Sequence, residues 1–225
     1  MLESLGSVLP NAVAIAISPL PIIAVILMLM SPRARQLGVG FLLGWVIGVS
    51  AATTVFTLLA GVIPEPDSSG GSRPVIAVIQ LVLGALLVLL GVRQWKSRPK
   101  PGEEAELPAW MSKIDAMRPM AALALGFALA AVNPKNLLMA AAAGTVIGRA
   151  AELAIGGQLA TIGLFTVIAA LTVAIPVLLA VFAPKKAASV LASVRVWLAE
   201  HNAAIMTVVL LVLGAQVIGK GLASF

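Results

Sequence analysis

The stretch Asn133-Pro134-Lys135-Asn136 interrupts an apolar run over residues 120–144 that is otherwise suited to crossing a membrane. Proline removes a backbone hydrogen bond from a helix, and it biases the preceding Asn133 away from helical backbone angles. Non-helical backbone and charged side chains at membrane depth are tolerated only where protein or a water-filled cavity satisfies them. We therefore predict that this stretch breaks a transmembrane helix and that Lys135 marks a substrate pathway.

The composition of the whole chain indicates an integral membrane protein. Of its 225 residues, 60% are hydrophobic and 11% are charged, whereas soluble domains carry about 25% charged residues. The formal net charge is +6, but the basic residues lie in short segments between apolar runs, where they would meet anionic lipid. Nucleic-acid binding is therefore not expected. The lack of cysteine excludes disulfides, thiolate metal sites and cysteine nucleophiles.

Six apolar runs predict six transmembrane helices, and the first of them also contains a break. Ser18-Pro19-Leu20-Pro21 lies near the middle of this first run, residues 5–30. Proline inside a helix kinks or unwinds it, so Pro19 and Pro21 are predicted to break the first span as Pro134 breaks the fourth. The remaining spans are predicted at residues 37–63, 74–95, 153–182 and 203–221, with an amphipathic stretch at 185–200.

The distribution of lysine and arginine predicts the orientation of the chain. Most of these residues follow the first, third and fifth spans, whereas the other side carries only Arg73, Arg149 and Lys220. Cytoplasmic loops collect positive charge, so both termini are predicted outside the cytoplasmic membrane and the polar segment 96–119 inside the cell. Within this segment a short interfacial helix is predicted from the apolar face formed by Trp110, Met111, Ile114 and Met117.

The two halves of the chain resemble each other. Leu81-Val82-Leu83-Gly84-Ala85 in the third span recurs as Leu211-Val212-Leu213-Gly214-Ala215 in the sixth. Three spans per half reverse the direction of the chain, so we predict two inverted repeats, residues 1–95 and 120–225, joined by the linker 96–119. Inverted repeats with matched broken helices point to a secondary transporter whose substrate site lies near the bilayer midplane, where the breaks meet.

The side chains at the two breaks suit a transient anion. Lys135 is the only ionisable residue well inside a predicted span, and Asn133, Asn136 and Ser18 lie at the breaks beside it in the expected fold. Metal transport and conventional proton relays need carboxylate, imidazole or thiolate groups at depth, so neither a metal site nor such a relay is expected. A carboxylate, phosphate or sulfate is the expected ligand. The alternative is that Lys135 bonds carbonyls freed by the break and holds the kink.

No enzymatic function is expected. The sequence contains neither a nucleophile–base–orienter set nor a phosphate-binding glycine loop, so catalytic residues and cofactors are not predicted. The most regular glycine pattern, Gly40, Gly44 and Gly48, places small residues on one helix face and is typical of helix packing. Such faces would permit a homodimer without requiring one.

These motifs resemble the LysE/RhtB superfamily of exporters. Members of that superfamily carry counterparts of four features: the Pro-x-Pro helix at 18–21, the basic turn at 31–35, the glycines at 40, 44 and 48, and the Asn-Pro-Lys stretch. The alanine-rich spans and the central loop are most similar to the GAP branch, the sulfolipid-addressing (Sap) family, and the resemblance covers essentially the whole chain. It implies six helices as an inverted pair, with a role in moving complex glycolipids toward the cell surface, together with other membrane machinery.

Two departures from the superfamily pattern argue against an amino-acid substrate. Ile22 follows Pro21 where amino-acid exporters usually carry a polar residue, and Asn136 replaces their usual alanine. The predicted function is therefore export of an anionic or amphiphilic envelope lipid, glycolipid or precursor. Export of a small amino acid or similar solute stays open. So does a non-transporting scaffold that recruits lipid-synthesis or export machinery through residues 96–119.

Overall fold

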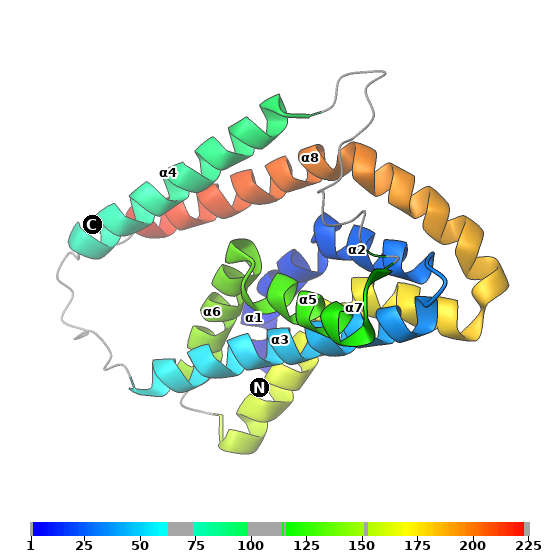
Figure 1. The fold of residues 1–225 in the computed structure, drawn as a ribbon. Helices are drawn as coiled ribbons and strands as arrows, with labels where there is room; N and C mark the ends of the chain where they lie inside the picture. Colours follow the sequence, from blue (N-terminus) through cyan, green and yellow to red (C-terminus); the bar gives the residue numbers. More distant parts are fainter. Residues whose placement is uncertain (1, 63–73, 99–113, 115, 151–152, 223–225) are drawn as a thin grey trace. The chain divides into compact units, whose positions relative to one another are not determined.

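The computed structural model describes residues 2–62, 74–98, 114, 116–150 and 153–222. These residues form α-helices with no strand among them, which confirms the all-α prediction (Figure 1). The helices in chain order are α1 (Leu2–Ala16), α2 (Pro19–Leu29), α3 (Ala34–Val62), α4 (Pro74–Lys96), α5 (Pro119–Ala131), α6 (Pro134–Arg149), α7 (Ile155–Phe182) and α8 (Pro184–Leu222).

Several of these helices can cross a membrane. Ala34–Ala60 within α3, Ile155–Phe182 and Ser189–Gly219 within α8 are each long and apolar enough. The pair α1 and α2 and the pair α5 and α6 pass the same test only when each pair is taken together. The described residues therefore give 3 spans, or up to 5 if each bent pair is one span, and the six-span inverted repeat stays a prediction.

The surface of the helices is apolar where a soluble protein would be polar. Leu58 of α3 is 65% exposed, Leu89 of α4 is 63% exposed and Val167 of α7 is 59% exposed. Extended apolar surface of this kind marks a site of contact with membrane or protein. Together with the length of the helices, it indicates a membrane-embedded protein.

The chain forms two compact units. Unit 1 comprises Met1–Pro64 and Leu107–Val196, and unit 2 comprises Glu65–Glu106 and Trp197–Phe225. This grouping follows packing rather than internal repetition, so the halves 1–95 and 120–225 with their linker remain a prediction. The interfacial helix predicted within 96–119 lies largely outside the described residues.

Both predicted helix breaks are present in unit 1. α1 and α2 are bent by 53° at residues 17 and 18, and α5 and α6 are bent by 62° at residues 132 and 133. Each second helix begins with a proline, Pro19 or Pro134, at a position where the missing N–H has no intrahelical partner to lose. The Asn133 side chain caps α6 by accepting a hydrogen bond from the Lys135 backbone N–H at 3.1 Å.

Glycines let α3 and α5 pack with their backbones in contact (Figure 1). A Cβ added to Gly40 would lie 2.8 Å from the carbonyl oxygen of Pro119, and one added to Gly48 would lie 2.8 Å from Ala130 Cβ. A Cβ on Gly44 would overlap the Leu123 carbonyl. From the other helix, Gly126 faces the backbone of α3 equally closely. Small residues on both helices therefore set this approach.

Aromatic side chains of α3 fill the core of unit 1 and connect it to α7. Phe41 and Trp45 are fully buried, and their rings stack with centroids 6.3 Å apart. The Trp45 indole donates a hydrogen bond to the Ala169 carbonyl of α7 at 3.2 Å. This bond satisfies the only polar atom of the indole, which permits the ring to be buried without an unpaired donor.

In unit 2, the repeated pentapeptides meet at one helix crossing. A Cβ on Gly84 of α4 would lie 2.9 Å from the Gly214 oxygen of α8, and one on Gly214 would lie 3.0 Å from the Gly84 oxygen. The two helices run side by side in Figure 1. The contact is thus reciprocal, because the glycine of each repeated pentapeptide packs against the backbone of the glycine in the other.

The stretches 185–200 and 203–221, predicted as two elements, belong to one helix. α8 runs without interruption over Pro184–Leu222. No glycine or proline occurs between residues 185 and 213, so nothing in the sequence terminates the helix before it enters the predicted span. The separation into two elements was therefore wrong.

Candidate functional site

The two helix breaks meet around the ammonium group of Lys135. This group donates hydrogen bonds to the Ala14 carbonyl at 2.6 Å, to the Ile17 carbonyl at 3.3 Å and to the Ser18 hydroxyl at 2.6 Å. Ile17 and Ser18 form the first break and Ala14 lies in the last turn of α1, whereas Lys135 lies in the first turn of α6, directly after the second break. The lysine is only 7% exposed, so these contacts lie inside unit 1.

The acceptors are available because α1 ends where it does. The last carbonyls of a helix have no intrahelical N–H partner. The Ser18 N–H bonds the Ala16 carbonyl instead of the Ala14 carbonyl, and Pro21, which would reach the Ile17 carbonyl in a continuous helix, has no N–H. The Lys135 ammonium supplies the missing donors, and the three contacts use its full donor capacity.

Ser18 and Asn136 extend this contact into a buried network. The Ser18 hydroxyl accepts from Lys135 and donates to the Asn136 side-chain oxygen at 3.1 Å. The Asn136 amide donates in turn to the Leu129 carbonyl of α5 at 2.9 Å. Ser18 is 3% exposed and Asn136 is fully buried. The network therefore ties the first break to both helices that flank the second.

The structure adds a residue that the sequence did not single out, Thr172 of α7. Its hydroxyl donates to the Ala16 carbonyl of the first break at 2.7 Å. Threonine in an apolar helix usually bonds a carbonyl of its own helix, as Thr53 and Thr57 do in α3. Nothing in the sequence distinguishes Thr172 from these residues, because its role depends on how α7 lies against α1.

The predicted residues divide into three groups. Lys135, Asn136 and Ser18 form the network, while Asn133 stands beside it as the cap of α6. The helix-break residues Pro19, Pro21 and Pro134 lie in the first turns of α2 and α6 without side-chain hydrogen bonds of their own. The packing glycines Gly40, Gly44 and Gly48 lie at the contact between α3 and α5 instead.

The charge of Lys135 has no carboxylate beside it in the described part of the chain. The only described carboxylates are Glu3, in the first turn of α1, and Glu200, on α8. No group of His, Cys, Asp or Glu among the described residues could hold a metal ion. Within the described ranges, only neutral oxygen acceptors contact the ammonium, so these residues hydrogen-bond its positive charge without neutralising it.

These observations define an all-helical membrane protein with two broken helices that meet at a buried lysine. A family model matches the chain over residues 8–223, and its description is Sap, sulfolipid-1-addressing protein. The protein belongs to the Sap family. This assignment confirms the resemblance seen in the sequence. No curated protein and no solved structure matches the chain.

Replacing Thr172 with valine is expected to destabilise unit 1 by about 1 kcal/mol, because the Ala16 carbonyl loses one of its two hydrogen bonds. The melting temperature in detergent should fall by roughly 2–4 °C. Thr172→Ser keeps the hydroxyl and should melt close to the wild type. Thr145→Val is the matched control, because Thr145 bonds Ala141 of its own helix. Equal melting of the two valine variants would contradict a structural role for the contact between α7 and the first break.

Proposed function

We propose that the protein exports an anionic or amphiphilic lipid of the cell envelope, or a precursor of one, across the cytoplasmic membrane. The observation that carries this proposal is the buried ammonium of Lys135, which lies where the two helix breaks meet and has no carboxylate beside it among the residues that the structure describes. In the transporter folds that have matched broken helices, substrate binds at the breaks. The prediction of an exporter and the geometry of the site therefore point to the same residues.

The charge at the site favours an anionic substrate. Moving a charged side chain into a membrane interior is expensive, and neutral dipoles offset only part of this cost. A phosphate or sulfate group would add the opposite charge. The helix N-termini at Pro19 and Pro134 add positive partial charge near the breaks. The family description names a sulfolipid, which is an anionic lipid by its name, and this supports the same class for the present chain.

Alternating access would use the Lys135 network as a latch. Lys135 holds the end of α1 through Ala14, Ile17 and Ser18. A substrate anion that binds the ammonium would compete with these neutral acceptors and loosen the first break. A ligand can shift a protein between two states only by binding one of them better, and this competition supplies that difference. The similar bends of the two broken pairs support a pair of inverted repeats as the moving parts.

One observation favours the scaffold alternative. All three donors of the ammonium are occupied by the chain itself, which is what a purely structural lysine requires. In that case Lys135 only compensates for the lost backbone hydrogen bonds. A small-solute exporter is the remaining alternative, because a substrate carboxylate would suit the same ammonium.

The test compares substrates in liposomes that contain the purified protein. Transbilayer movement of fluorescent phosphatidylglycerol, which is anionic, is measured beside that of phosphatidylcholine, which is zwitterionic, and beside efflux of labelled amino acids. We expect phosphatidylglycerol to move several-fold faster than phosphatidylcholine, with no amino-acid efflux above protein-free liposomes. Amino-acid efflux without lipid movement would favour the solute exporter. The scaffold alternative predicts that neither lipid nor amino acid moves. It also predicts that deletion of residues 96–119 abolishes envelope assembly in cells, whereas Lys135→Met leaves it intact.

A further inference from the structure

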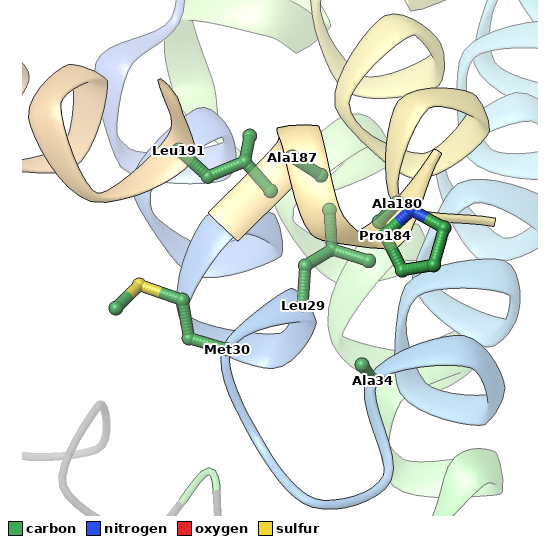
Figure 2. A pocket seen from close by; sticks show the side chains of 7 residues that line it. All are labelled: Leu29, Met30, Ala34, Ala180, Pro184, Ala187 and Leu191. Carbon is green, nitrogen blue, oxygen red and sulfur yellow. The ribbon is translucent and has the colours of Figure 1, made fainter. Parts of the chain in front are cut away.

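Unit 1 contains an apolar cavity whose lining includes none of the residues at the two helix breaks. It is bounded by the end of α2, the start of α3, the end of α7 and the start of α8, and its volume is about 270 Å³ (Figure 2). Every side chain that lines it belongs to leucine, methionine, alanine or proline. Leu29, Ala187 and Leu191 are buried within it, while Met30 is 46% exposed at its edge.

The cavity suits hydrocarbon and not a polar solute. Small-molecule sites usually combine an apolar wall with a few polar groups that orient the ligand. No lining side chain here offers such a group. The one hydroxyl close by in sequence, that of Ser31, already donates to the Met28 carbonyl at 2.7 Å. The volume of about 270 Å³ lies just below the range for ligand pockets, about 300–1,000 Å³, so the cavity would hold one hydrocarbon chain rather than a whole lipid.

The chain segments that form the cavity carry positive charge only. Arg33 and Arg35 flank the lining residue Ala34, and both are exposed. Lys185 and Lys186 directly follow the lining residue Pro184 in the sequence. No aspartate or glutamate occurs in residues 4–64 or 153–199, which include all four walls. An apolar cavity whose lining residue Ala34 lies between two exposed arginines is complementary to an anionic head attached to a hydrocarbon chain.

We propose that this cavity binds one acyl chain of an anionic lipid, whose phosphate or sulfate head is held by Arg33 and Arg35. The inference deepens the proposed function by giving the lipid a second contact site away from Lys135, and it depends on that function only for naming the bound lipid as cargo. The head would lie at the turn between α2 and α3. In Figure 2 the Leu29 side chain points toward Ala187 and Pro184, across the space that the acyl chain would occupy.

The test maps lipid contacts by photo-crosslinking in nanodiscs. Phosphatidylglycerol and phosphatidylcholine, each with a diazirine at the end of one acyl chain, are compared as probes, and labelled peptides are identified by mass spectrometry. We expect phosphatidylglycerol to label the peptides that contain Leu29 and Leu191 several-fold more than phosphatidylcholine does. Ala187→Leu fills the cavity and should reduce this labelling several-fold. Ala34→Leu fills the cavity from α3 and replaces Ala187→Leu in the test if that variant does not fold.

The charge contribution is tested separately. The double variant Arg33→Gln, Arg35→Gln should bring labelling by phosphatidylglycerol down to the level of phosphatidylcholine. Arg149→Gln is the matched control, since Arg149 is an exposed arginine at the end of α6 and away from the cavity lining. The proposal would be overturned by equal labelling with the two lipids in the wild type, or by unchanged labelling in both cavity-filling variants. Either result would show that this surface contacts membrane lipid without selecting an anionic head. The crosslinking experiment does not measure transport. A negative result would therefore overturn the proposed lipid site without contradicting the export function, which the liposome assay tests.

Discussion

Replacing Lys135 with methionine is expected to lower the rate of anionic-lipid movement in proteoliposomes at least about ten-fold, which corresponds to about 1.4 kcal/mol in the barrier. Methionine keeps the length and apolar volume of the side chain but removes its charge and all three of its donors. The substrate anion then loses its opposite charge, and the latch to Ala14, Ile17 and Ser18 is lost as well. Initial rates for phosphatidylglycerol, measured at equal protein content, provide the comparison.

Stability alone would not reveal the role of Lys135. Carbonyls left without a donor destabilise the variant by about 1–3 kcal/mol each, whereas removing a buried charge relieves a desolvation penalty of several kcal/mol. These terms oppose each other, so the transport rate is the informative measurement and melting serves only to verify folding. Lys96→Met, at the exposed end of α4, is the matched control and should transport at the wild-type rate.

A second variant separates two roles of Lys135, its hydrogen bonds to the end of α1 and its contact with the substrate. Ser18→Ala removes one partner of Lys135 and the bond to Asn136 while leaving the charge in place. If the residues act as one unit, the effects of Ser18→Ala and Lys135→Met on the rate should not be additive, with a coupling of about 0.5–3 kcal/mol. A Lys135→Met protein that is folded and moves lipid at the wild-type rate would show that the lysine only holds the kink.

Replacing Gly44 with alanine is expected to cost about 3 kcal/mol or more, the upper part of the range for overpacking a well-packed contact. The new methyl group would overlap the Leu123 carbonyl and would also meet the Phe127 backbone. Backbone atoms cannot move aside as a flexible side chain can, so α3 and α5 must separate. Each kcal/mol should lower the melting temperature by roughly 2–4 °C.

Gly163→Ala in α7 is the matched control for this prediction. A Cβ at Gly163 would meet nothing within 4 Å, so only the intrinsic preference of alanine for helix remains. This preference should stabilise the variant by about 0.5–1 kcal/mol. Similar melting temperatures for Gly44→Ala and Gly163→Ala would contradict the close backbone contact between α3 and α5.

Local residue chemistry made much of the fold predictable. Pro19 and Pro134 break their helices at the predicted positions because the missing N–H and the ring act within one turn, whatever surrounds them. The apolar composition predicts membrane helices because lipid offers no partner for backbone groups. The end of the predicted element 185–200 was wrong for the same local reason, since no glycine or proline separates it from the span that follows.

The sequence by itself therefore determined the class of protein, its helical content, its two breaks and the residue types at the site. Only the tertiary structure decided which groups meet. Lys135 bonds Ala14 and Ile17, and Thr172 bonds Ala16, across more than a hundred residues of chain. The cavity beside Ala34 and Ala187 likewise joins distant segments. Such contacts depend on the bend at each break and on how closely the glycine faces of α3 and α5 approach, and neither quantity is encoded in a single stretch of residues.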